Sequence, residues 1–191
     1  MSSPAPQTND VLLEATGVSK SFPGVRALDG VNLTVRRGRL NALLGENGAG
    51  KSTMMNILAG VFPPDAGTVR LAGKPVRFKN TREAQAAGIA VIYQELNLVP
   101  ELSIAENIFI GREPLNRFGL VDYDRMNADT AKLLEDLELD ADPRTLVSQL
   151  KVGAQQVVEI ARAISFNARV IIMDEPTSAI TEHEIEMLFR Q

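Results

Sequence analysis

Apolar positions along the chain follow two spacings, which predict strands and helices in alternation. Short apolar runs are typical of buried strands, and three of them occur at residues 40–44, where Asn41 is the one polar residue, at 89–92 and at 170–173. Apolar residues at helical spacing follow the first run, at residues 54–61. This pattern predicts an α/β fold with a parallel core sheet.

Strict alternation of apolar and polar residues predicts an antiparallel β element beside that core. Residues 31–35 alternate in this way, so one face of the strand is expected to be buried. Residues 11–15 and 68–72 are predicted as further strands, with a tight turn at residues 73–74 and a turn-like segment at residues 19–24.

Capping residues and apolar stripes predict the helices. The capping-box pattern occurs in Asn80 with Glu83 and in Ser103 with Glu106, and residues 181–184 repeat it near the end of the chain. Two apolar stripes predict longer helices that pack in a core. One consists of Met126, Thr130, Leu133, Leu134 and Leu137, and the other, after Gly153, of Val157, Ile160, Ala161 and Ile164.

Composition narrows the possible classes of protein. The chain has 191 residues and a net charge of −4, which predicts one domain and argues against a general nucleic-acid binder. It has no cysteine and one histidine, His183, which excludes disulfides and a multi-histidine zinc site. No apolar run reaches the ~18 residues of a transmembrane helix. Residues 1–10 lack the apolar core of a signal peptide, so we expect a disordered tail and a cytoplasmic protein.

The most specific motif is a glycine-rich segment between the first predicted core strand and its helix. It fits the phosphate-loop pattern G-x-x-x-x-G-K-[ST] and consists of Gly45, Glu46, Asn47, Gly48, Ala49, Gly50, Lys51, Ser52 and Thr53. Glycines let successive backbone N–H groups approach an anion, and the helix N-terminus adds the positive end of its dipole. Lys51 can reach the β- and γ-phosphates, and the Ser52 hydroxyl can ligate Mg²⁺. The alternative is a glycine-rich turn that only packs a helix on a sheet, but both the motif and its strand–loop–helix context favour the phosphate loop.

A pair of carboxylates follows the third predicted core strand. At the end of such a strand Asp174 can hold Mg²⁺, and Glu175 can orient or deprotonate an attacking water. The alternative for an isolated Asp-Glu pair is a solvated loop end. The phosphate loop upstream favours the metal-site interpretation.

Further landmarks resemble one family. They are Tyr93-Gln94-Glu95-Leu96, Val152-Gly153-Ala154-Gln155-Gln156 and Asp174-Glu175-Pro176-Thr177-Ser178-Ala179. With the phosphate loop, their order and spacing resemble the ATP-binding cassette (ABC) family from about Leu12 to the last residue. Segments such as residues 84–89, 105–109, 111–114 and 158–161 resemble more narrowly the ATPase component of bacterial monosaccharide importers of the ribose, xylose and galactose type. The N-terminal of their two cassettes is the better match.

The resemblance implies roles for particular positions. Phe22 would stack on adenine, the alternative being a plain core aromatic residue. Gln94 would contact Mg²⁺ or the attacking water, Asp174 would be the magnesium-side carboxylate, and Glu175 would be the general base. Residues 178–181 would touch an opposing cassette.

The resemblance also implies a domain organisation and partners. Residues 11–94 and 163–191 would form an ATP-binding core that is incomplete at its C-terminus, and residues 95–162 would form a helical subdomain. The expected cofactors are ATP and Mg²⁺. The expected partners are transmembrane permease subunits, a second cassette in the same polypeptide or a homodimer, and indirectly a solute-binding protein, with no nucleic acid. The location would be peripheral, at the cytoplasmic face of the bacterial inner membrane.

The chain departs from the family pattern at two places. Lys151 stands where the family's signature has a serine, which leads to the hypothesis that this half serves a weakened or non-hydrolytic site in trans. The family's switch histidine follows the Asp174-Glu175 segment by roughly thirty residues, whereas this chain ends at Gln191 and His183 lies too close. We therefore expect a C-terminally truncated cassette with weak ATP binding and little hydrolysis by itself.

Two competing interpretations remain. One is a non-transport cassette ATPase that acts as a nucleotide-gated binding module, and the other is a catalytically silent regulatory cassette. The first class tends to carry long coiled-coil insertions or basic linkers. The short segment between Gln94 and Gly153 and the acidic composition favour the transport interpretation.

Overall fold

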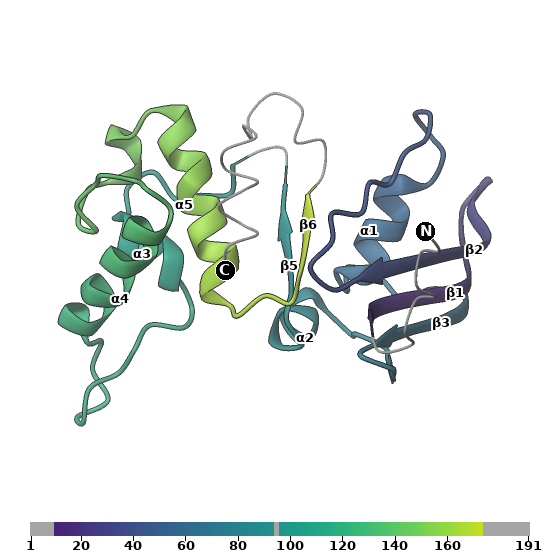
Figure 1. Cartoon of the computed structure of the whole chain (residues 1–191), viewed down its shortest axis with the longest axis horizontal. Helices are drawn as coiled ribbons and strands as arrows, with labels where there is room; N and C mark the ends of the chain where they lie inside the picture. Colours follow the sequence, from purple (N-terminus) through teal and green to yellow (C-terminus); the bar gives the residue numbers. More distant parts are fainter. Residues whose placement is uncertain (1–9, 94–95, 174–191) are drawn as a thin grey trace, which may run out of the picture. The chain divides into compact units, whose positions relative to one another are not determined.

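The computed structural model describes residues 10–93 and 96–173. The chain forms two compact units, residues 1–89 and residues 90–191 (Figure 1). The predicted tail lies outside the described residues apart from Asp10, whose carbonyl accepts a hydrogen bond from the Arg37 amide at 2.9 Å. The discontinuous division into a core and a helical subdomain stays a prediction.

A four-stranded antiparallel sheet dominates the first unit, in the order β2-β1-β3-β4. Its strands are β1 (Val11–Phe22), β2 (Val25–Arg36), β3 (Ala66–Leu71) and β4 (Lys74–Val76) (Figure 1). The predicted antiparallel element is therefore confirmed. The turn-like segment at residues 19–24 was predicted too long, because β1 continues to Phe22 and only Pro23 and Gly24 turn.

The predicted turn between β3 and β4 is present one residue earlier than predicted, at Ala72 and Gly73, because Lys74 already belongs to β4. Ala72 and Gly73 both have positive φ, 49° and 77°, which is the backbone of a two-residue hairpin turn. Glycine adopts that conformation without steric cost, so Gly73 is suited to its place.

Helix α1 (Lys51–Leu58) covers the core of this unit with Met54, Ile57 and Leu58. Gly60, with φ 75°, ends the helical path as predicted, and an added Cβ would lie 2.6 Å from the Asn80 carbonyl oxygen. The next helix, α2 (Thr81–Ala86), begins at Asn80, whose side chain accepts from the Glu83 amide. Its capping box is only half formed, because the Glu83 carboxylate accepts from the Lys79 amide.

The prediction of a buried strand at residues 40–44 is wrong. Neither sheet includes these residues, and Leu40 and Leu44 are 71% and 87% exposed. An apolar run reports a tendency to be buried, but a strand also needs a neighbouring backbone with which to form hydrogen bonds. Within residues 10–93 and 96–173 no strand pairs with this segment.

The second unit combines two short strands with helices. The strands β5 (Ile89–Ile92) and β6 (Val170–Met173), both predicted, pair and run in the same direction (Figure 1). The helices are α3 (Ile104–Phe109), α4 (Tyr123–Asp136), the short 3-10 helix η1 (Val147–Gln149) and α5 (Val152–Ser165). Both predicted apolar stripes are confirmed, since α4 and α5 bury them in one core.

Helix α3 begins at a complete capping box, as predicted. The Ser103 hydroxyl accepts from the Glu106 amide, and the Glu106 carboxylate accepts from the Ser103 amide and hydroxyl. The Ser103 hydroxyl and amide hold the pKa of the Glu106 carboxyl below its ordinary value.

Asn107, one turn into α3 and fully buried, organises the segment before the helix. Its side-chain oxygen accepts from the Val99 amide at 2.7 Å. Its side-chain nitrogen donates to the carbonyls of Val99, Leu102 and Ser103 at 3.0, 3.2 and 2.9 Å. The three carbonyls also accept backbone amides, whereas the Val99 amide has the Asn107 side chain as its acceptor among the described residues.

Arg112 connects the C-terminal ends of α3 and α5. Its guanidinium donates to the Ile108 carbonyl at 2.7 Å and to both the carbonyl and the hydroxyl of Ser165. It also lies 3.6 Å from the centroid of the Phe166 ring. Burial lowers the pKa of this guanidinium, yet arginine remains charged in proteins.

Candidate functional site

The glycine-rich segment forms an exposed loop that leads into α1. Gly48 and Gly50 both have φ of 86°, the left-handed conformation that brings backbone N–H groups to one side of a turn. The Ala49 amide donates to the Glu46 carbonyl at 3.1 Å and so closes the turn. Gly50 is the N-cap of α1 and supplies no side-chain cap.

Several amides of this loop form no hydrogen bond with the part of the chain that the structure describes. They belong to Gly48, Gly50, Lys51, Ser52 and Thr53. Because these residues lie at the start of α1, their amides include the N–H groups that a helix cannot satisfy internally. An anion with several oxygens matches such donors.

Lys51 extends back over the loop. Its ammonium donates to the carbonyls of Gly45 and Glu46 at 2.7 and 2.9 Å. Both acceptors are neutral, so no carboxylate of the described residues pairs with this ammonium. The loop residues therefore fit a polyphosphate.

Gly50 also fixes the loop against the sheet of its unit. A Cβ at this position would lie 2.5 Å from the Ala27 carbonyl oxygen and 2.6 Å from Leu28 Cδ2, both on β2. Because only glycine fits this close approach, the start of α1 is held against the β1–β2 hairpin.

Phe22 lies at the end of that hairpin and is 37% exposed. Its ring meets Phe62 edge to face, with centroids 5.4 Å apart and an interplanar angle of 84°. The alternative of a plain core aromatic residue does not describe this position, because more than a third of the side chain is accessible. Sequence analysis did not single out Phe62, and no local pattern distinguishes it.

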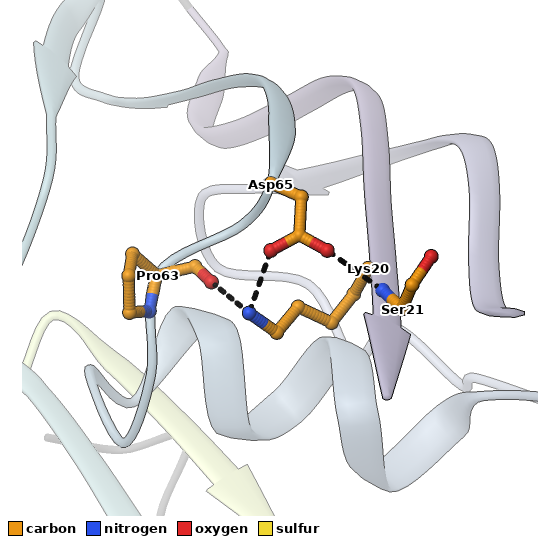
Figure 2. A network of polar contacts seen from close by, with 4 residues as sticks. All are labelled: Lys20, Ser21, Pro63 and Asp65. Atoms are coloured by element: carbon orange, nitrogen blue, oxygen red, sulfur yellow. Dashed lines mark hydrogen bonds and ion pairs between the residues drawn. The ribbon is translucent and has the colours of Figure 1, made fainter. Parts of the chain in front are cut away.

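A polar network joins the end of β1 to residues 63–65 (Figure 2). The Lys20 ammonium donates to Asp65 Oδ1 at 2.8 Å and to the Pro63 carbonyl at 3.0 Å, and the Ser21 amide donates to Asp65 Oδ2 at 2.8 Å. The Lys20 ammonium, and then the Ser21 amide, hold the pKa of the Asp65 carboxyl below its ordinary value. Sequence analysis missed Lys20 and Asp65 as well.

The other predicted site residues are only partly described. The Ser52 side chain is exposed, so its hydroxyl is accessible to a metal ion, and Thr53 is half-buried. Gln94, Asp174 and Glu175 lie outside the described residues, as do residues 178–181 and His183. Among the described residues no group of three or more His, Cys, Asp and Glu side chains could hold a metal ion.

Lys151 is the N-cap of α5 and makes no side-chain capping hydrogen bond. Gly153 has open space around the position of a Cβ, so this helix N-terminus is accessible. Gln155 connects the helix to the preceding turn by donating to the carbonyls of Val147 and Leu150 at 3.1 and 3.2 Å.

In the described ranges no helix is long and apolar enough to cross a membrane.

The chain is similar to curated import proteins over nearly its whole length. It is 61% identical over 183 residues to the ribose import ATP-binding protein RbsA of Rhodopirellula baltica, covering 96% of this chain and 36% of the relative. It is 55% identical over 187 residues to a putative ribose/galactose/methyl galactoside import ATP-binding protein of Burkholderia lata, covering 98% of this chain and 36% of the relative. The chain thus spans about a third of the length of these relatives.

Solved structures of ATP-binding cassettes share the fold. The ADP conformation of the cassette MJ1267 aligns with a TM-score of 0.78 at 28% identity, covering 94% of this chain and 74% of the cassette. A dimeric post-hydrolysis state of the cassette MJ0796 bound to ADP and Pi aligns with a TM-score of 0.73 at 28% identity, covering 93% and 79%. These alignments confirm the predicted fold class. A family model described as ABC transporter matches residues 28–178, so the chain belongs to the ABC transporter family.

Proposed function

We propose that this chain is the ATP-binding part of a carbohydrate importer, in which ATP hydrolysis drives monosaccharide uptake through membrane permease subunits. One observation carries the proposal: a loop with unpaired amides and a lysine ammonium, in a chain 61% identical to a ribose import ATP-binding protein. The protein would act at the cytoplasmic face of the bacterial inner membrane, as a peripheral subunit. A solute-binding protein would deliver the sugar to the permease.

Different residues of the chain would bind the parts of Mg·ATP and take part in its hydrolysis. The loop amides and Lys51 would hold the polyphosphate and stabilise the charge that develops on it, which is the main source of catalysis in phosphoryl transfer. Ser52, Gln94 and Asp174 would hold Mg²⁺, which supplies charge neutralisation when bound. Glu175 would accept the proton of the attacking water. Phe22 would stack on the adenine base.

The phosphate-binding part of this proposal predicts a calorimetric result. Titrating Mg·ATP into the full-length protein should give a saturable heat of binding, because unpaired amides and an ammonium meet a polyanion. Adenosine with the same magnesium concentration is the control and should bind far more weakly, because it keeps the base but lacks the phosphates. Absence of heat with Mg·ATP would contradict the proposal.

Lys151 gives a test of the hypothesis that one site is weakened. A serine hydroxyl can both donate and accept at the N-terminus of α5, whereas the exposed Lys151 caps nothing. Lys151→Ser should raise the steady-state ATPase rate of the full-length protein about two- to tenfold, the value of one hydrogen bond made in the transition state. Lys132→Ser, on the exposed side of α4, is the control and should leave the rate unchanged.

An unchanged rate in the Lys151→Ser variant would argue against a weakened site in trans.

The alternative of a non-transport cassette is tested separately. Co-purification with a polytopic membrane protein is expected for an importer subunit and would be absent for a nucleotide-gated binding module.

A further inference from the structure

The aromatic and ionic contacts at the end of the β1–β2 hairpin form a cluster that phosphate chemistry does not explain. We call it the Phe22 support and define it as Lys20, Phe62, Pro63 and Asp65. Phe62, Pro63 and Asp65 belong to the segment that follows α1, and Lys20 belongs to β1. Two segments more than 40 residues apart therefore meet around one exposed ring.

The hairpin that carries Phe22 also lies against the phosphate loop at Gly50. Lys20 pairs with Leu28 across the β1–β2 ladder, and Leu28 is one of the residues that leave no room for a side chain at Gly50. The Phe22 ring and the N-terminus of α1 are therefore both positioned by the backbone of the β1–β2 hairpin. A shift of the hairpin end would move the ring relative to the bound phosphates.

Lys20 is placed unusually for a lysine, since its side chain is only 14% exposed. A buried ammonium loses its hydration shell, which costs free energy. Here the hydrogen bonds to Asp65 and to the Pro63 carbonyl, together with the nearby rings of Phe22 and Phe62, compensate for that loss. Its nitrogen lies 5.8 Å from the Phe22 centroid and 5.4 Å from the Phe62 centroid. These contacts fix the segment of Phe62 against β1 (Figure 2).

The edge-to-face contact restrains the orientation of Phe22. An exposed aromatic side chain otherwise samples several rotamers, and fixing the ring in one of them when a base stacks on it costs free energy of binding. The perpendicular Phe62 ring favours one plane, and the accessible part of Phe22 remains available for a second flat partner.

We propose that Phe62 and the Lys20–Asp65 pair are positioning residues that hold the Phe22 ring in the plane on which the nucleotide base stacks. This inference rests on the proposed function, in which Phe22 contacts the base. The positioning residues act through Phe22 and do not touch the phosphates. They therefore contribute to the affinity for a nucleotide but not to the affinity for an inorganic polyphosphate.

The test compares two ligands by calorimetry on the full-length protein, Mg·ATP and magnesium tripolyphosphate. Phe62→Ala should raise the Kd for Mg·ATP about three- to tenfold, the value of an aromatic contact, and leave the Kd for tripolyphosphate unchanged. Phe62→Leu keeps apolar volume without a ring and should show the same selective loss, which guards against misfolding of the alanine variant. Asp65→Asn should give a smaller loss of the same kind.

A double-mutant cycle separates positioning from an independent contact. Phe22→Ala/Phe62→Ala should bind Mg·ATP no more weakly than Phe22→Ala alone, because Phe62 acts through Phe22. Phe118→Ala, an exposed phenylalanine of the second unit, is the matched control and should change neither Kd.

Three results would overturn the inference while leaving the proposed function intact. They are an unchanged Kd for Mg·ATP in both Phe62 variants, an equal loss for tripolyphosphate, and additive losses in the double variant. Failure of the proposed function looks different. The wild-type protein would then bind neither ligand, or Phe22→Ala would bind Mg·ATP as tightly as the wild type.

Discussion

Replacing Lys51 with alanine is expected to weaken the binding of Mg·ATP by the full-length protein about 100-fold or more. The ammonium lies over the loop and can exchange two neutral carbonyl acceptors for anionic phosphate oxygens. Charge-assisted hydrogen bonds contribute about 1.5–3 kcal/mol each, and about 1.4 kcal/mol corresponds to a tenfold change in Kd. Calorimetric titration of the variant with Mg·ATP measures the loss.

The matched control is Lys74→Ala, an exposed lysine at the start of β4 in the same unit. It removes the same charge from the protein and should change the Kd less than about twofold, because salt screens surface charges that are not in contact. If both variants lost the same affinity for Mg·ATP, Lys51 would act only through the net charge of the protein and not through contact with the phosphates. If Lys51→Ala bound Mg·ATP as tightly as the wild type, the glycine-rich loop would not be the polyphosphate site.

Replacing Asn107 with leucine is expected to lower the free energy of unfolding of the second unit by about 1–3 kcal/mol. Leucine keeps most of the volume but removes the acceptor of the Val99 amide and the donor to three carbonyls. The three carbonyls keep the backbone donors Leu102, Val147 and Asn107, so the Val99 amide is the group that loses its partner. A buried polar group without a partner costs about 1–3 kcal/mol, and Asn107 is buried. This loss is at least as large as the ~1 kcal/mol typical of a helix cap.

Hydrogen exchange at the amides of α3, measured against urea concentration, reports this loss locally, which suits a chain with two compact units. Asn41→Ala is the control, because the exposed Asn41 amide donates only to the Arg39 carbonyl, and it should change stability by less than about 0.5 kcal/mol. Unaltered protection of α3 in the Asn107 variant would mean that the turn does not depend on this side chain.

Local patterns predicted the features that depend on near neighbours. The Ser103–Glu106 capping box, the turn at Gly73 and the stripes of α4 and α5 all rest on residues within a few positions of each other. The phosphate loop was recognised for the same reason, since its glycines and lysine occupy a fixed spacing. Such features follow from the backbone geometry of one turn or one helix.

The features that sequence analysis missed depend on distant residues. Residues 40–44 are apolar, but no neighbouring strand is present in the described structure to pair with them. Phe62 and Asp65 gain their role only where they meet β1, more than 40 residues earlier. Composition and periodicity do not predict contacts between residues this far apart in the sequence. From its local sequence, Lys20 cannot be distinguished from an ordinary surface lysine.

Arg112 restrains α3 and α5 against sliding along each other. One guanidinium is anchored to the last turn of α3 and to the last turn of α5, and the two helices also contact each other directly. Sliding one helix along the other would break these bonds and unstack Phe166. We therefore expect α3 and α5 to move together, so that a displacement of α3 would also displace Lys151 at the N-terminus of α5.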